Sequence, residues 1–402
     1  MPELTIDGVA HGGEGVGRID GKAHFIAGAM PGERVEIEVV KEKRRWARGR
    51  LIDIIEASSD RIDAPCPAYP TCGGCTWQHA AYEQQLEWKR EVVQGQLAHV
   101  GGLDAADVRP TIAPGSPFGY RNRMDFSVLN GRPALHEYRS SSLVPLDACL
   151  LLRPELAERF ASLGDLSGVS KIVLRYGVGT GDALVLVEGK LPGHAGTWNA
   201  SVVHRAREGL RIIKGRRWFE EEVGGVRFRV PAAAFFQVNS EGAGELVRLV
   251  SEAAAVTESD VLLDGYAGVG LFAGTVGRSA GRVITIDVGR SAYKAVRGNL
   301  EHSIPGRFRS LLGAFEHVAP TLDDAWDVAI VDPPRAGLGA DGVAAVTGPR
   351  PRTIVLISCD PAALGRDAGL LRDEGYELEW AQPVDLFPQT YHVETVSRFA
   401  LS

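Results

Sequence analysis

The chain contains five cysteines, and their spacing is the first sign of chemistry. They are Cys66, Cys72, Cys75, Cys149 and Cys359. The first three fall within ten residues, and the glycine pair between Cys72 and Cys75 lets the backbone wrap around a bulky centre. In a chain expected to be cytoplasmic this cluster indicates a metal site rather than a disulfide framework. Cys149 is available as a fourth ligand, and the spacing leaves zinc and an iron–sulfur cube both open.

The fifth cysteine, Cys359, follows the apolar run TIVLIS (353–358) in the sequence SCDP. A cysteine at the end of a buried strand is a candidate nucleophile if its thiolate is favoured, although one alone is more often a packing residue. Three neighbours favour catalysis. Asp332 begins the rigid DPPR sequence, Gln237 lies in FFQVN at the entrance of the same region, and Glu394 in HVE offers a general base.

A glycine-rich turn, DGYAGVG (264–270), directly follows the predicted strand VLLD. Asp287 ends the next predicted strand about twenty residues later, where a carboxylate can accept hydrogen bonds from ribose hydroxyls. The turn is not a full dinucleotide fingerprint, so it suits S-adenosylmethionine better than a pyrophosphate. The alternative is a Rossmann-like sheet that binds no cofactor.

These residues need a parallel sheet to bring them together. From about residue 230 the chain alternates strands with helices, and the strands are expected at 261–264, 283–287, 328–332 and 353–358. Each is a short apolar run of the kind that a sheet buries on both faces. Ligands bind beyond the carboxyl ends of such strands, so Asp264, Asp287 and Asp332 are expected to line one crevice.

The first 56 residues have a different pattern from the C-terminal part. Short alternating strands and glycine turns there predict a small barrel of the OB type. Its segment KEKRRWARGR (41–50) is basic and carries Trp46, although the chain has a net charge of −7. Nucleic-acid binding and a merely solvated surface are equally compatible with this segment. A helix is expected near 80–99. No apolar run approaches a membrane span and no signal peptide is recognised, so a cytoplasmic protein is expected.

Five sequence blocks together resemble the signature motifs of the uracil-5 RNA methyltransferases, which make 5-methyluridine in tRNA and 23S rRNA. They are FFQVN, DGYAGVG, DPPRAG, SCDPAALGRD and FPQTYHVETV. The cysteine segment looks like the 4Fe-4S site of the ribosomal members, and the N-terminus resembles their TRAM domain. The resemblance implies an α/β protein of three parts: an OB-like TRAM barrel (1–58), a mixed α+β central domain with the iron–sulfur site (59–228) and a Rossmann-like class I methyltransferase domain (229–402).

The resemblance also implies a role for individual residues. Cys359 falls on the nucleophile and Glu394 on the base. The S-adenosylmethionine contacts are expected at Gln237, Tyr266, Gly268, Asp287 and Asp332, and the cluster ligands at Cys66, Cys72, Cys75 and Cys149. The segment GYRNRMDFSV (119–128) is similar to one that faces RNA. Gly265, Ala267 and Asp287 depart from the family's usual Leu, Cys and Glu, which puts cofactor affinity in question.

Two other classes of protein remain as alternatives. Some radical S-adenosylmethionine enzymes carry a cluster and a TRAM domain, but their CxxxCxxC spacing differs from the one found here. A non-catalytic RNA-binding or assembly factor would not need both Cys359 and Glu394. RNA is therefore the expected partner, with 23S rRNA favoured over tRNA. A monomer without an obligate protein partner or a membrane contact is expected.

Overall fold

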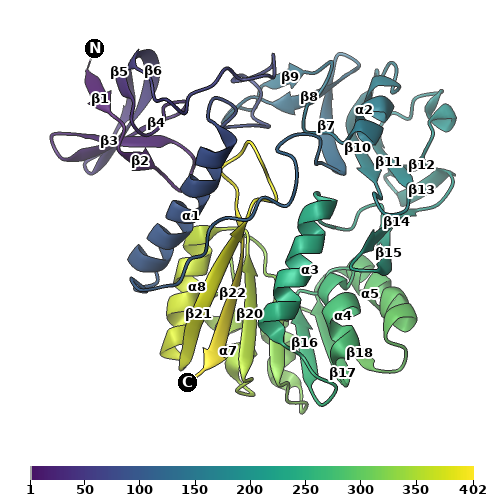
Figure 1. Cartoon of the computed structure of the whole chain (residues 1–402). Helices are drawn as coiled ribbons and strands as arrows, with labels where there is room; N and C mark the ends of the chain where they lie inside the picture. Colours follow the sequence, from purple (N-terminus) through teal and green to yellow (C-terminus); the bar gives the residue numbers. More distant parts are fainter. Residues whose placement is uncertain (1) are drawn as a thin grey trace.

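Short strands with alternating burial build the N-terminal barrel of the computed structural model, which describes residues 2–402 (Figure 1). Its six-stranded sheet has the order β1-β5-β6-β4-β3-β2. Val35 and Ile37 are fully buried on β5, whereas Val39 is 38% exposed because the strand continues past the small core. The strands are β1 (Glu3–Thr5), β2 (Gly8–Val9), β3 (Gly15–Ile19), β4 (Lys22–Ile26), β5 (Arg34–Glu42) and β6 (Trp46–Glu56).

The central part is a seven-stranded sheet of order β13-β12-β11-β10-β7-β8-β9 with the short helix α2 packed on it. All neighbouring strands are antiparallel except β11 and β12. A separate hairpin, β14 with β15, follows it. The elements are β7 (Arg123–Leu129), β8 (Arg132–His136), β9 (Leu143–Pro145), α2 (Pro154–Ala161), β10 (Val169–Tyr176), β11 (Ala183–Gly189), β12 (Ser201–Ala206), β13 (Gly209–Lys214), β14 (Trp218–Val223) and β15 (Val226–Pro231).

The C-terminal part is a second seven-stranded sheet, of order β18-β17-β16-β19-β20-β22-β21. The first five strands in this order are parallel and β22 is antiparallel to both of its neighbours. The elements are α3 (Ser240–Ala254), β16 (Val261–Gly265), α4 (Leu271–Thr275), β17 (Arg282–Asp287), α5 (Arg290–Ser303), β18 (Phe308–Leu312), α6 (Phe315–Val318), β19 (Val328–Val331), α7 (Gly339–Thr347), β20 (Thr353–Ser358), α8 (Pro361–Asp373), β21 (Tyr376–Val384) and β22 (Glu394–Leu401).

The four strands expected in this sheet are confirmed as β16, β17, β19 and β20, with Asp332 one residue beyond β19. The three-part division at residues 58 and 228 stays a prediction. None of the helices within residues 2–402 has the length and apolarity needed to cross a membrane.

The expected helix near 80–99 is α1 (Tyr82–His99), and it packs against α8 of the C-terminal sheet (Figure 1). Val93 and Leu97 share a core cluster with residues of α8. The approach is close because position 365 is a glycine: a Cβ there would lie 2.5 Å from the carbonyl oxygen of Gln96. Helix α1 therefore joins the barrel and central parts to the C-terminal sheet.

Candidate active site

Three carboxylates meet at the carboxyl edge of the C-terminal sheet, as the parallel strands require. Asp264 lies on β16, Asp287 ends β17 and Asp332 follows β19. The pKa of Asp264 is raised to about 8, mainly by burial and further by the charges of Asp332 and Asp287. One of its oxygens accepts a hydrogen bond from the Ala273 N–H, whereas its Oδ1 is buried with no partner among residues 2–402. The three carboxylates thus lie close together, and a buried oxygen without a partner lies among them.

The glycine turn after β16 wraps around Asp287. Tyr266, Gly268 and Gly270 all have positive φ, and the Gly268 N–H donates to Asp287 Oδ2 at 2.8 Å. A Cβ built at Gly268 would meet no atom within 4 Å, so the turn opens onto free space above the sheet. At Gly265 the opposite holds, because a Cβ there would lie 2.9 Å from the Phe315 ring. Phe315 thus occupies the space that a Leu at position 265, the residue usual in the resembled family, would need.

Cys359 lies between the end of β20 and the start of α8. The next residue, Asp360, caps α8 by accepting hydrogen bonds from the N–H groups of Ala362 and Ala363. The Cys359 side chain is half-buried. Its pKa is raised to about 12, by burial first and then by the negative charges of Glu394 and Asp332, while Arg335 acts in the opposite direction. The free protein therefore holds Cys359 as a thiol.

Glu394 reaches the same place from the far end of the chain. Because β22 runs antiparallel to β20, its first residues pair with the last residues of β20, and Thr395 faces Ser358. This register puts Glu394 beside Cys359. Burial and the charge of Asp332 raise the pKa of Glu394 well above its usual range. A carboxylate in such a place accepts a proton readily, as a general base must.

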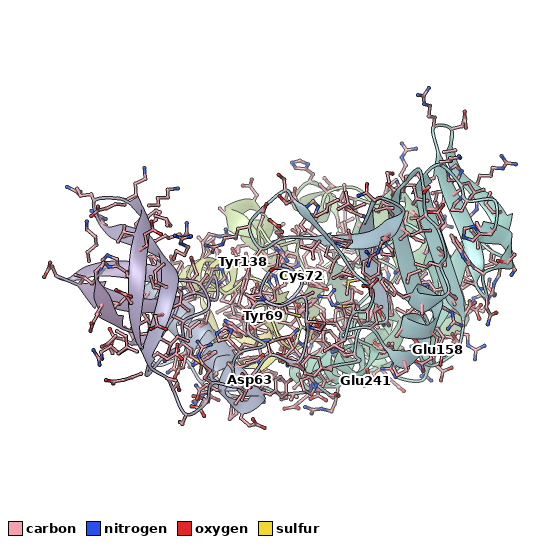
Figure 2. All side chains as sticks on the ribbon, turned by 90° about the horizontal axis from the view of Figure 1, so that it is seen from above. Asp63, Tyr69, Cys72, Tyr138, Glu158 and Glu241 are labelled. Carbon is pink, nitrogen blue, oxygen red and sulfur yellow. The ribbon has the colours of Figure 1, made fainter. Side chains whose placement is uncertain are left out.

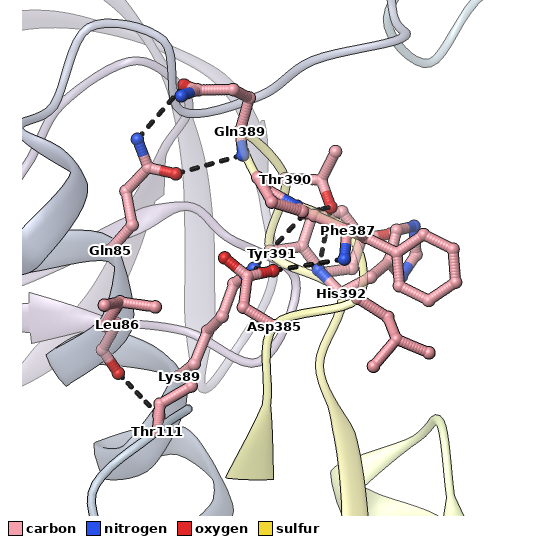
Figure 3. A network of polar contacts seen from close by, with 12 residues as sticks. Gln85, Leu86, Lys89, Thr111, Asp385, Phe387, Gln389, Thr390, Tyr391 and His392 are labelled. Atoms are coloured by element: carbon pink, nitrogen blue, oxygen red, sulfur yellow. Dashed lines mark hydrogen bonds and ion pairs between the residues drawn. The ribbon is translucent and has the colours of Figure 1, made fainter. Parts of the chain in front are cut away.

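A buried polar network holds the loop that leads to Glu394 (Figure 3). Lys89 on α1 donates to Asp385 at 2.5 Å, and both side chains are fully buried. Gln85, one helical turn earlier, exchanges two hydrogen bonds of 3.1 Å with Gln389, whose φ is +68°. Neither residue of α1 was expected in the site. The sequence pattern that could have indicated them is their spacing of four residues, which puts both polar side chains on the face of the helix that also carries its apolar residues.

Replacing Lys89 with Met is expected to lower the free energy of unfolding by about 3–5 kcal/mol, because the change leaves Asp385 buried without its cation. Urea denaturation measures this loss. Glu83→Gln removes a charge from an exposed position of the same helix and is expected to change stability by less than about 0.5 kcal/mol. Adding Asp385→Asn to Lys89→Met should restore part of the stability. Equal stability of Lys89→Met and Glu83→Gln would contradict the prediction.

The segment that carries Gln237 is held by the central sheet. Arg175 is fully buried on β10, and one of its nitrogens donates to the carbonyl oxygens of Pro231, Ala232 and Ala234. The side chain of Asn122 donates to the main-chain oxygen of Gln237 at 3.2 Å. Sequence reasoning missed Arg175, because an arginine in an apolar strand carries no motif. These contacts determine where the chain enters the C-terminal sheet.

The four clustered cysteines line one small cavity, together with leucines that include Leu135 and Leu151. The pKa of Cys75 is raised to about 12 by burial, and the other three cysteines add to the effect. Figure 2 shows Cys72 between the barrel and the central sheet, close to Tyr69 and Tyr138. Within residues 2–402 no group of three or more His, Cys, Asp or Glu side chains is arranged to hold a single metal ion. The four cysteines thus converge on one cavity.

Comparison with known proteins agrees with this architecture. A profile of the TRAM domain matches residues 3–52. An uncharacterized RNA methyltransferase of Streptomyces avermitilis is 35% identical, over 98% of this chain and 97% of its own. Another, from Halalkalibacterium halodurans, is 31% identical over 98% of this chain and 96% of its own. Both similarities extend over nearly the whole of each protein.

Among solved structures, the tRNA (uracil-54, C5)-methyltransferase of Pyrococcus abyssi, in complex with S-adenosyl-L-homocysteine, matches with a TM-score of 0.78. The two chains are 25% identical, and the match covers 99% of this chain and 100% of that one. Fold, site and relatives define an RNA methyltransferase. The chain belongs to the uracil-5 RNA methyltransferase family. This assignment favours a methyltransferase over the radical enzyme and the non-catalytic factor.

Proposed function

We propose that the protein transfers a methyl group from S-adenosylmethionine to C5 of a specific uridine in RNA, through a covalent bond between Cys359 and C6. The observation that carries this proposal is the antiparallel register of β20 and β22, which puts a thiol and a buried carboxylate side by side. This pair matches the two steps that the reaction requires. Uracil C5 must first become nucleophilic, and its proton must later be removed.

In the first step the Cys359 thiol gives up its proton to solvent, the resulting thiolate forms a bond to C6, and the electron pair of the C5–C6 double bond makes C5 enolate-like. S-adenosylmethionine would supply an electrophilic methyl group to C5, and its sulfonium sulfur would keep the electron pair of the broken bond and leave as the thioether S-adenosylhomocysteine. Glu394 then accepts the C5 proton, the double bond re-forms, and the bond between sulfur and C6 breaks to regenerate the thiolate. The uridine must be flipped out or unpaired to reach the half-buried Cys359.

The carboxyl edge of the C-terminal sheet is where a nucleoside-containing cofactor would bind. The space above Gly268 and the unsatisfied oxygen of Asp264 are the features that a bound ligand would use. Asp287 would accept hydrogen bonds from the ribose hydroxyls, since its carboxylate lies at the end of β17 beside the turn. Tyr266, together with Gln237 and Asp332, completes the proposed cofactor-binding set.

We favour 23S rRNA as the substrate because the chain combines a TRAM domain with the cysteine cluster. The similarity to a tRNA uracil-54 methyltransferase supports tRNA as the second candidate. Incubating the protein with methyl-labelled S-adenosylmethionine and unmodified rRNA or tRNA transcripts tests both. Digestion of the labelled RNA should release 5-methyluridine. Label in another nucleoside, or in neither RNA, would reject the proposal.

We propose further that Cys66, Cys72, Cys75 and Cys149 bind one 4Fe-4S cluster. Four thiol groups around one largely apolar cavity are the ligand set that such a cluster requires. The cavity lies far from Cys359 in the sequence, so the cluster would support structure or RNA contact.

Protein purified without oxygen is expected to be brown and to contain about four iron atoms per chain, which iron and acid-labile sulfide assays measure. Cys149→Ser removes one ligand and should lower the iron content. Cys359→Ser changes a cysteine outside the cavity and should leave the iron content unchanged. One zinc per chain without labile sulfide would refute the cluster.

The tip of the β5–β6 hairpin is the proposed electrostatic contact for RNA. Lys43, Arg44 and Arg45 are exposed and form no ion pair with any residue between 2 and 402. Beside them, Lys41 and Arg48 lie 5.7 Å and 5.2 Å from the centre of the Trp46 ring. Cations around an aromatic ring suit a nucleic-acid backbone and an unstacked base.

Replacing Lys43, Arg44 and Arg45 with Ala is expected to weaken RNA binding and to lower the slope of log affinity against log salt by about two to three. The methylated position should stay the same, because phosphate contacts carry no base information. Binding titrations at several salt concentrations measure the slope. An unchanged slope would show that the hairpin tip is only solvated surface.

A further inference from the structure

The turn between β2 and β3 of the barrel reaches into the active site. His11 Nε2 lies 3.3 Å from Asp360 Oδ2, the carboxylate of the residue that follows Cys359. This is the ring's one polar contact in the described chain, since His11 Nδ1 is buried there without a partner. The barrel therefore contacts the segment that carries the nucleophile.

The same turn also contacts the segment that carries the base. Gly13 has a φ of +80°, and a Cβ there would lie 2.7 Å from the Cβ of Tyr391, three residues before Glu394. The carbonyl of Gly13 accepts a hydrogen bond of 2.9 Å from the Trp77 indole. Glu14, which is buried, pairs with Arg139 of the central part. These contacts hold the turn against both catalytic segments.

Asp360 is held from two sides. Its Oδ1 accepts the N–H groups of Ala362 and Ala363 at the start of α8, and its Oδ2 faces His11. The pKa of Asp360 is lowered to about 2, with the hydrogen bond from His11 as the largest cause. The carboxylate is thus charged, and its plane is fixed by groups on opposite sides. Without His11 the carboxylate would be held by the helix alone.

We propose that His11 is a positioning residue for methyl transfer: by fixing Asp360 it orients the adjacent Cys359 toward C6 of the bound uridine. The proposal rests on the proposed function, because it assumes that Cys359 is the nucleophile. It gives the barrel two separable tasks. The β5–β6 hairpin tip adds affinity for RNA, whereas the β2–β3 turn aligns the nucleophile.

The test compares His11→Ala with His11→Gln in the full-length protein. RNA carrying 5-fluorouridine at the target position reports the rate of covalent bond formation, because fluorine cannot leave as the proton does and the adduct persists. His11→Ala is expected to form the adduct about tenfold more slowly at saturating RNA, with the Kd for RNA unchanged within about twofold. His11→Gln keeps a donor at a similar place and should recover most of the rate.

The variant with Lys43, Arg44 and Arg45 replaced by Ala is the matched control on the barrel. It should raise the Kd for RNA with little effect on the adduct rate at saturation, the reverse of His11→Ala. Equal adduct rates for His11→Ala and the wild type would overturn the proposal. So would a His11→Ala protein with both a higher Kd for RNA and a lower melting temperature, or a His11→Gln protein as slow as His11→Ala. If the wild-type protein forms no adduct, the proposed function fails instead.

Discussion

Cys359→Ala is expected to lose methyl transfer by at least about 10⁴-fold and to form no covalent complex with RNA. Without a sulfur at this position nothing can add to C6, so C5 stays too weak a nucleophile. A half-buried Cys-to-Ala change is small, and the protein should fold and bind RNA as before. Transfer of labelled methyl and a denaturing gel with 5-fluorouridine RNA measure both losses. Retained activity would mean that Cys359 is a packing residue.

The surroundings of Cys359 also predict how the rate of adduct formation depends on pH. Burial and the nearby carboxylates Glu394 and Asp332 raise the pKa of the thiol to about 12. The thiolate is therefore the minor form at neutral pH, and its fraction grows about tenfold per pH unit below that pKa. The rate of adduct formation should rise with pH. A rate that falls with rising pH would contradict this environment.

Glu394→Gln is expected to stall the reaction after methyl transfer. The amide keeps the shape of the side chain but cannot take the C5 proton, so the bond between Cys359 and C6 cannot break. Turnover should fall by about 10²–10⁴-fold, and protein cross-linked to methylated RNA should accumulate as a slowly migrating band.

Wild-type protein with 5-fluorouridine RNA provides the reference band, since it is trapped at the same stage. A structural role for Glu394 predicts a different result: lower stability in urea and no accumulated adduct. Normal turnover of Glu394→Gln would show that another group is the base, even if Cys359 remains the nucleophile.

The strands of the catalytic sheet were predictable because each is a short apolar run buried on both faces. Asp264, Asp287 and Asp332 were predictable as neighbours for the same reason, since parallel strands end at one edge. What could not be predicted is how Glu394 reaches them. Its place depends on the pairing of β22 with β20, and the register of two strands far apart in the chain is set by packing of the whole sheet.

The contacts that α1 and the β2–β3 turn make at the site also could not be predicted from local sequence patterns. Lys89 in a helix normally indicates a solvated position, yet here tertiary packing buries it against Asp385. His11 lies in a glycine-rich turn with no motif, and only the placement of the barrel brings it to Asp360. The residues proposed to do the chemistry were visible in the sequence, whereas the residues proposed to position them were not.

The packing of α1 on α8 has a consequence for the modularity of this enzyme. The catalytic sheet begins near residue 230, and a fragment starting there would contain every residue assigned to the reaction itself. Such a fragment would leave Asp385 as a buried charge without Lys89 and would expose the face of α8 that Val93 and Leu97 cover. Gln389 would lose its two bonds to Gln85. The methyltransferase sheet is thus not a unit that can be exchanged between proteins unless α1 travels with it.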